Sequence, residues 1–305
     1  MQPLANTYLP GPGLEAVIEL ALEMGRPLLV TGEPGTGKTR LADFVAQKLK
    51  LDPPLVFNTK TDAQAIDLFY SYDAIRHYRD SARPDATANA LEYISFQALG
   101  QAILESGEKR NVVLIDEIDK APRDFANDLL FEFEELAFQV KEASTEETKA
   151  FLGDAHEVDE QGFIRVQKGE NRPVLILTSN SEKNLPDAFM RRVLYHHIEF
   201  PTHSRLQEIV AANVPDDIQL NQVLVEAAIE HFEDIRENKR LRKRPATAEL
   251  LAWIHVLHRK QERADLQRAL EADSPREVKM AIFNTYSLIA KNKDDLATLK
   301  RDLGL

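Results

Sequence analysis

Uninterrupted runs of hydrophobic residues recur through the first two-thirds of the chain. Three of them are strong, at residues 27–31, 111–116 and 173–179, and a weaker fourth covers residues 55–58. Runs of this length, separated by segments of helical periodicity, are typical of buried parallel strands covered by helices. Each strong run ends in polar residues, and the carboxyl ends of the strands are where an open α/β sheet binds its ligands. The pattern predicts an α/β fold built on a parallel sheet.

The pattern changes after residue 201. Residues 203–305 contain almost no glycine and show helical periodicity throughout. The sequence therefore predicts two domains, an α/β core over residues 1–202 and an all-helical domain over residues 203–305. Two segments do not fit this plan: residues 61–87 are polar and aromatic, and residues 141–172 are acidic and mixed. Loops this long inside a compact domain are more often functional than idle.

A glycine-rich motif directly follows the first hydrophobic run, because residues 32–39 spell Gly-Glu-Pro-Gly-Thr-Gly-Lys-Thr. Such a turn lets backbone N–H groups point at phosphate oxygens, and the following helix adds its positive end. The Lys38 side chain can reach the β- and γ-phosphates, and the Thr39 hydroxyl can bind Mg²⁺. We predict a nucleoside triphosphate site. Its expected contacts are Gly32, Pro34, Gly35, Thr36, Gly37, Lys38, Thr39 and Arg40.

The other two strong runs end in residues suited to hydrolysis. Asp116 and Glu117 close the second run, where Asp116 would hold Mg²⁺ through water and Glu117 would orient a water or take its proton. Asn180 follows the third run and could align that water, provided that its strand lies beside the other two. A strand running into a solvated turn is the alternative for each motif alone. Together with the glycine-rich motif they predict nucleotide hydrolysis.

Two adjacent arginines, Arg191 and Arg192, follow a short helical stretch. Adjacent arginines usually form a solvated basic spot. The functional alternative is an arginine finger, which stabilises the charge that develops on the transferred phosphoryl group and accelerates hydrolysis by about 10³- to 10⁵-fold.

Composition limits the classes of partner. The formal net charge of −12 argues against a general nucleic-acid or anionic-membrane binder, because both need a basic surface. The chain has no cysteine, which excludes disulfides and thiolate metal sites. No hydrophobic stretch approaches the roughly 18 residues of a membrane span, and the N-terminus lacks a signal pattern. We expect a soluble cytoplasmic protein.

In order and spacing, these motifs resemble those of the AAA+ ATPases, most closely the MoxR-type branch. Residues 32–39 are similar to the Walker A motif, 112–117 to Walker B, and 178–180 to sensor 1, with Asn180 as the sensor. Residues 185–192 look like the segment that ends in the arginine finger, where Arg192 aligns best. The resemblance covers residues from about 10 to about 260.

The resemblance implies an AAA+ core that binds ATP and Mg²⁺, with the helical half as its lid. Residues 61–87 fall where MoxR proteins carry a helix-2 insert, so Phe69, Tyr70 and Tyr72 become candidates for a pore-facing loop. Packing of these aromatic side chains in the core is the alternative. Residues 138–140 and 163–166 look like the two arms of a pre-sensor hairpin, widened by the acidic insertion within residues 138–172.

The sensor 2 motif departs from the MoxR pattern. Members of that branch carry a sensor 2 arginine just after a proline, whereas this chain has three basic residues just before Pro245. Arg244 is the first candidate to reach the γ-phosphate, and Lys243 is the second. The basic run 239–244 could instead form a small patch for an anionic partner.

The implied function is ATP hydrolysis by a homo-oligomeric, hexameric ring in which Arg192, with Arg191, acts on a neighbour's nucleotide. By resemblance, such a ring remodels a client protein and often partners a von Willebrand A-domain protein. Two alternatives stay open: a slowly hydrolysing nucleotide switch in a signalling or defence system, and a small-molecule kinase with a phosphate-binding loop.

Overall fold

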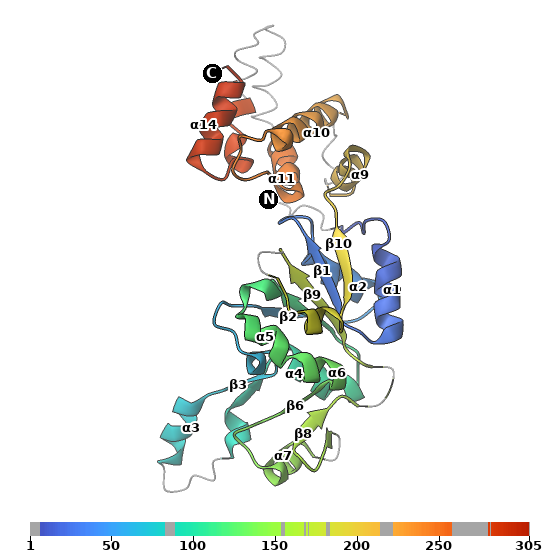
Figure 1. Ribbon diagram of the computed structural model, residues 1–305, viewed down its shortest axis with the longest axis vertical. Helices are drawn as coiled ribbons and strands as arrows, with labels where there is room; N and C mark the ends of the chain where they lie inside the picture. The colour runs from blue at the N-terminus through green and yellow to red at the C-terminus, as the bar shows by residue number, and fades with distance from the viewer. Residues whose placement is uncertain are drawn as a thin grey trace. The chain divides into compact units, whose positions relative to one another are not determined.

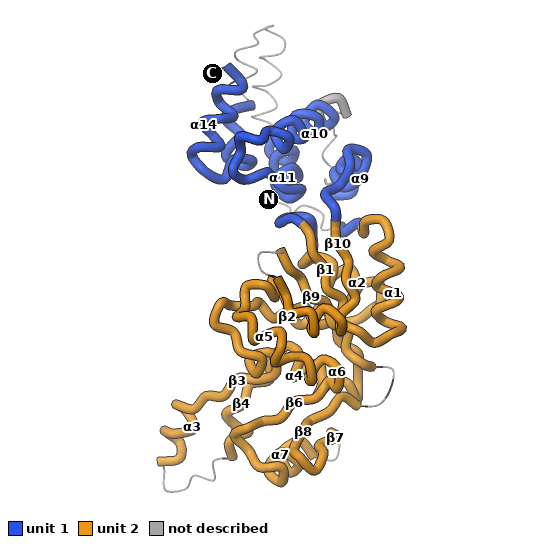
Figure 2. Tube along the Cα trace, in the orientation of Figure 1, with its two compact units in different colours: residues 1–9, 33–37, 199–305 blue, residues 10–32, 38–198 orange. Residues whose placement is uncertain are grey.

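The chain forms two compact units in the computed structural model (Figure 2). Unit 1 consists of residues 1–9, 33–37 and 199–305, and unit 2 consists of residues 10–32 and 38–198. The structure describes residues 7–82, 89–153, 156–167, 169, 171–180, 184–213, 222–257, 280 and 282–304. Within these ranges, only the backbone is described for residues 222–224.

A parallel sheet forms the centre of unit 2, with the strand order β10-β1-β9-β5-β2 (Figure 1). The three strong hydrophobic runs are its three central strands, and the weaker run is the edge strand β2. This confirms the predicted α/β fold and places β9 between β1 and β5. The strands are β1 (Leu28–Gly32), β2 (Leu55–Asn58), β5 (Val112–Asp116), β9 (Val174–Ser179) and β10 (Leu194–Ile198).

Strand β10 has no counterpart among the predicted runs. It lies at the sheet edge, and half-buried and exposed positions alternate along its sequence, Leu-Tyr-His-His-Ile. An edge strand has less hydrophobic surface to bury, so it lacks the continuous run that marks a central strand. Its parallel register with β1 still extends the sheet by one strand.

Helices α1 (Leu14–Met24), α2 (Arg40–Lys48) and α4 (Ala98–Leu104) of unit 2 contact this sheet. Helix α2, for example, buries Leu41, Ala42, Val45 and Ala46, which recur at helical spacing. Helix α1 ends at Gly25, whose left-handed φ of 61° suits a glycine cap. The helices are α1 (Leu14–Met24), α2 (Arg40–Lys48), α3 (Ala74–Ser81), α4 (Ala98–Leu104), α5 (Arg123–Asp128), α6 (Leu130–Glu135), α7 (Thr145–Leu152) and α8 (Asp187–Met190).

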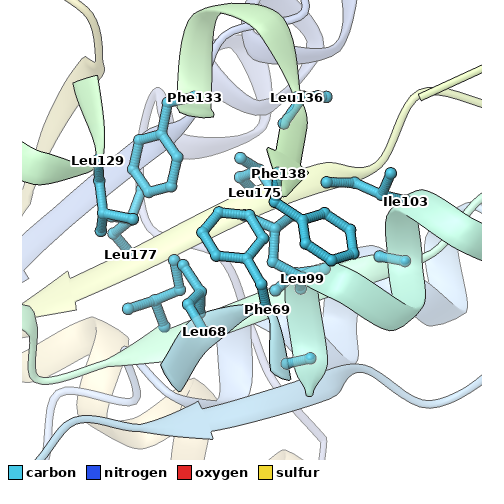
Figure 3. Close-up of a cluster of buried hydrophobic side chains, with 14 of the residues drawn as sticks. Leu68, Phe69, Leu99, Ile103, Leu129, Phe133, Leu136, Phe138, Leu175 and Leu177 are labelled. Atoms are coloured by element: carbon cyan, nitrogen blue, oxygen red, sulfur yellow. The ribbon is translucent and has the colours of Figure 1, made fainter. Parts of the chain in front are cut away.

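The aromatic segment within residues 61–87 belongs partly to the core. Phe69 and Tyr70 are only 2% and 3% exposed, and the Phe69 ring stacks on Phe138 with 5.1 Å between ring centroids (Figure 3). The Tyr70 hydroxyl donates to Glu142 at 2.7 Å, and burial raises its pKa. The pore-loop prediction is therefore wrong for Phe69 and Tyr70, because the hydrophobic core takes both rings. Tyr72 is half-buried and its hydroxyl bonds the ring of His77.

A short antiparallel pair carries this segment, β3 (Tyr70–Tyr72) with β4 (Ile94–Phe96). Among the described residues of this segment, the exposed large hydrophobic side chains are Ile75 and Tyr78, one helical turn apart on α3. Residues 83–87, also within the predicted insert, lie outside the described residues. Three 3₁₀ turns lie nearby in unit 2: η1 (Ala65–Leu68), η2 (Ala90–Tyr93) and η3 (Glu105–Gly107).

A second small sheet lies within residues 137–165. Strand β6 (Ala137–Gln139) pairs antiparallel with β8 (Phe163–Arg165), and β7 (Glu157–Val158) continues the sheet. These are the segments in which the sequence places the two hairpin arms. The intervening α7 begins with a capping box between Ser144 and Glu147. Residues 154, 155, 168 and 170 of the predicted insertion lie outside the described residues.

Unit 1 is helical over its C-terminal part, as predicted. Its core contains Phe232, Trp253 and Tyr286, and the Trp253 indole N–H donates to the Thr285 hydroxyl at 2.7 Å. Within the described residues, no helix is long and hydrophobic enough to cross a membrane. The described elements are α9 (His203–Asn213), α10 (Gln222–Glu237), α11 (Thr247–Leu257), η5 (Tyr286–Leu288) and α14 (Lys293–Asp302).

Close backbone contact between α4 and the Phe69 segment predicts the effect of one substitution. A Cβ added at Gly100 would lie 2.0 Å from the Phe69 carbonyl oxygen, which also accepts from the Gln97 N–H at 2.8 Å. We expect Gly100→Ala to lower the free energy of unfolding by about 1–3 kcal/mol in urea titrations, through overpacking. Gly11→Ala, where the added Cβ meets nothing within 4 Å, is the control. Equal stability of the two variants would contradict the contact.

A histidine between two carboxylates predicts pH-dependent stability in unit 1. His203 Nδ1 lies 2.6 Å from Glu233 and Nε2 lies 2.8 Å from Glu226, and hydrogen bonds to both raise its pKa above the ordinary 6.5. Its stabilising contribution is full below pH 6.5 and is lost as pH rises through the folded pKa. Urea unfolding of His203→Gln should therefore show destabilisation at pH 6 that vanishes by pH 9. In the control His156→Gln, the ring nitrogen meets the Leu152 carbonyl instead, so a similar pH trend there would contradict this account.

Candidate functional site

The strand order brings the three motif-bearing strand ends together within unit 2. β1, β9 and β5 are adjacent and parallel, so their carboxyl ends meet at one edge of the sheet. Gly32 ends β1 and Asp116 ends β5, while Asn180 directly follows β9. The condition on which the sequence prediction for Asn180 depended, that its strand lies beside the other two, is met.

Lys38 and Thr39 lie at this edge. Lys38 is buried, and its ammonium donates to the Gly32 carbonyl at 2.8 Å. Thr39 precedes the first residue of α2, and its hydroxyl donates to the two Asp116 carboxylate oxygens at 3.1 and 3.3 Å. A hydroxyl and a carboxylate in contact are the hard oxygen donors that Mg²⁺ prefers. The residues present therefore fit the predicted metal ion.

The middle of the glycine-rich loop, residues 33–37, belongs to unit 1. Gly35 and Gly37 have φ values of 78° and 89°, a backbone conformation that favours glycine. A Cβ at Gly35 would lie 2.5 Å from the Cβ of Ala246, so that position also requires the absence of a side chain. The Thr36 hydroxyl turns back to donate to the Glu33 carbonyl at 2.8 Å. Pro34 and Arg40, the remaining predicted contacts, are exposed.

The buried hydroxyl of Thr178 joins the two acidic residues. It donates to Asp116 Oδ1 at 2.6 Å and accepts from the Glu117 N–H at 2.8 Å. Glu117 has φ 55° and ψ 50°, which a residue with a side chain adopts only at a cost. The Thr178 hydrogen bond stabilises this turn. The sequence-based interpretation did not assign Thr178 a role, although the register of two adjacent parallel strands places it next to Asp116.

Two side chains hold the Glu117 carboxylate. Asn180 Nδ2 donates to Glu117 Oε1 at 3.0 Å, and the Lys120 ammonium pairs with Glu117 Oε2. The Asn180 N–H in turn donates to Asp119 at 3.3 Å, within the turn η4 (Ile118–Lys120). The sequence paired Glu117 with Asn180 in one mechanism, but it did not indicate Lys120. An amide and a cation on separate oxygens fix the direction of this carboxylate.

The double arginine lies at the end of α8. Arg191 is exposed, whereas Arg192 donates to Glu134 Oε1 at 2.7 Å and to the Ala188 carbonyl at 3.0 Å. Both line a cavity of about 410 Å³ in unit 2. Among the described residues, no hydrogen bond or ion pair joins either arginine to Asp116, Glu117 or Asn180. Within one protomer, the two arginines therefore make no polar contact with these three residues.

An arginine of unit 1 contacts the glycine-rich loop. Arg236 of α10 is buried, pairs with Glu33 at 2.7 Å and lies over the Phe200 ring at 3.4 Å from the centroid. Arg244 and Lys243, the sensor 2 candidates, are exposed. Arg236 was missed by the sequence-based interpretation. Its signal was a basic residue four positions after Phe232, on the hydrophobic face of a helix.

Removing the Thr178 hydroxyl should separate its structural and functional effects. Thr178→Val keeps the shape but leaves the Glu117 N–H and Asp116 Oδ1 without this partner, so we expect about 1–3 kcal/mol lower stability. We also expect at least tenfold slower ATP turnover, because Glu117 loses its fixed position. Urea unfolding and phosphate release measure the two effects. Turnover at the wild-type rate would contradict the role assigned to Thr178, and Thr31→Val, on β1, controls for loss of a strand hydroxyl.

The solved structures that this chain resembles include two single-substitution variants of RuvB from Thermotoga maritima, each 16% identical with a TM-score of 0.47. The first covers 100% of this chain and 74% of its own, and the second covers 96% and 80%. No curated protein matches the sequence. Residues 27–193, more than half of the chain, match the AAA domain of the dynein-related subfamily. The chain therefore belongs to the AAA domain family, dynein-related subfamily, and to the general class of AAA ATPases.

Proposed function

We propose that this chain hydrolyses ATP with Mg²⁺ as one protomer of a MoxR-type ring that remodels a partner protein. The observation that carries the proposal is the contact chain from Thr39 through Asp116 and Thr178 to Glu117 and Asn180. It joins a metal-binding pair to an oriented carboxylate at the carboxyl ends of β5 and β9 and the start of α2. That combination supports hydrolysis rather than storage of a nucleotide.

In this proposal each residue of the cluster has one task. Thr39 and Asp116 would hold Mg²⁺, which neutralises phosphate charge when bound. Lys38 and the loop residues Gly32, Pro34, Gly35, Thr36 and Gly37, with Arg40, would bind the phosphates. Glu117 would accept a proton from the attacking water. At the same time the water oxygen would bond to the γ-phosphorus, and the bond from the γ-phosphorus to the β–γ bridging oxygen would break. Asn180 would orient both the carboxylate and the water.

The exposure of the double arginine supports the proposed ring. Arg191 is exposed and the Arg192 side chain is 33% exposed, so both are accessible to a second copy of the chain. We assign Arg192, with Arg191, to the nucleotide of a neighbour in a hexamer. Residues 1–202 would be the core and 203–305 the lid, from which Arg244 or Lys243 would reach the γ-phosphate as sensor 2.

The client of the ring is a protein in this proposal, with a von Willebrand A-domain protein as the partner class. The net charge of −12 supports a protein client over a nucleic acid. Tyr72, Ile75 and Tyr78 lie in the described part of residues 61–87, which would be the helix-2-type insert. Ile75 and Tyr78 are exposed at 67% and 80%, which supports a role for that segment in contact with a client.

A slowly hydrolysing switch is the second candidate, and one contact favours it. The Lys120 ammonium pairs with the Glu117 carboxylate that would accept the proton. A carboxylate oxygen that is bound by a cation is less available to the attacking water, and this slows hydrolysis without weakening nucleotide binding. Such a protein would bind ATP, assemble and turn over little.

Loss of Arg192 tests the ring. We expect Arg192→Ala to keep ATP binding and to lose turnover by about 10³-fold, because the charge on the transferred phosphoryl group loses its stabiliser. The measurement is ATP turnover per protomer against protein concentration, which should rise cooperatively in the wild type. Arg301→Ala, which removes another arginine that donates to the carbonyl four residues earlier, is the control.

Each rival gives a different result in the same assay. Unchanged steady-state hydrolysis in Arg192→Ala would overturn the finger. A specific activity independent of protein concentration would indicate a kinase-like monomer, and ATP binding with little turnover would indicate the switch.

A further inference from the structure

The cavity beside the double arginine concentrates positive charge in an acidic protein. Four arginines line it, and Glu134 is the carboxylate among its lining residues. A guanidinium presents several donors in a plane that match phosphate and carboxylate oxygens, so a group of them favours a polyvalent anion. The four arginines are Arg26, Arg172, Arg191 and Arg192.

One of these arginines is fixed by the main chain. Arg172 Nε donates to the Gly25 carbonyl at 3.2 Å, and its Nη2 donates to the Glu134 carbonyl at 3.4 Å. Burial lowers the pKa of Arg172, which shows that its charge is held at a cost. An anion in the cavity would reduce that cost. The Arg172 guanidinium is therefore held in position to bind an anion.

The Glu134 carboxylate is held differently. Its Oε1 accepts from Arg192 Nε at 2.7 Å, while the Glu134 side chain remains 53% exposed. Exposed ion pairs of this kind are weak. A phosphate group carries more charge and more acceptor oxygens than one carboxylate, so it competes well for the same guanidinium.

We propose that this cavity is a phosphate-binding site, in which Glu134 is the counter-ion of Arg192 in the isolated protomer and is replaced by a nucleotide phosphate held by a second copy of this chain. The inference rests on the proposed function, since it takes Arg192 to act across a ring interface. It adds Arg172 as a second cation of that interface. It also makes Glu134 a positioning residue that opposes assembly until the neighbouring copy has bound ATP.

The test is ATP turnover per protomer against protein concentration in Glu134→Gln. Removing the competing charge should lower the concentration of half-maximal activation by about two- to fivefold, the range set by an exposed ion pair. The rate at saturating protein should stay within about twofold of wild type, because the amide leaves Arg192 in place. The control is Glu15→Gln, which removes an equally short pair of 2.7 Å from a side chain of nearly equal exposure, 54%.

An unchanged midpoint, or a fall in the saturated rate toward that of Arg192→Ala, would overturn the inference. Thermal melting of both glutamine variants confirms that neither has unfolded. Titration of Lys38→Ala, which lacks the phosphate ligand of the glycine-rich loop, with inorganic phosphate at a protein concentration well below the activation midpoint should show no binding. Binding there would assign the cavity to free phosphate instead. Failure of the proposed function is visible separately, since wild-type turnover would then not depend on protein concentration at all.

Discussion

The hydrogen bond from the Thr178 hydroxyl to Asp116 is the interaction on which the candidate site depends. That hydroxyl is fully buried and serves both acidic residues, accepting from the Glu117 N–H while it donates to Asp116. It can do so because β9 lies directly beside β5 in parallel register. The order of the strands therefore sets the positions of the acidic side chains, so the geometry of the candidate site depends on how the sheet is assembled.

The glycine-rich loop is shaped by close contact and by charge. Gly35 lies so near Ala246 that a side chain would not fit, and Glu33 pairs with the buried Arg236 within unit 1. Arg236 is also stacked on Phe200 and donates to the Pro245 carbonyl. The ion pair thus joins helix α10 to the loop through Arg236, whose side chain is 10% exposed, and Glu33, whose side chain is 46% exposed. Movement of the loop would therefore change contacts in the helical part of unit 1.

The sequence predicted the parts of the molecule whose signals are local. Central strands are hydrophobic along their whole length, so the three strong runs predicted β1, β5 and β9, whereas the half-exposed β10 carries no such run. Motif spacing likewise placed Asn180 near Glu117. The contacts of Thr178, Lys120, Arg236 and Glu134 depend on register and tertiary packing, which no local pattern encodes. The same limit explains Phe69 and Tyr70, whose aromatic character fits a pore loop and a core equally well until their neighbours are known.

In the proposed ring, the arginines of one copy complete the catalytic site around a nucleotide that another copy binds. Mixing two inactive variants, Lys38→Ala and Arg192→Ala, tests this arrangement most directly. A mixed ring contains interfaces where an intact Lys38 meets an intact Arg192, so the equimolar mixture should recover about a quarter of wild-type ATP turnover under random assembly. A mixture as inactive as its two components, with assembly confirmed by light scattering, would contradict the account.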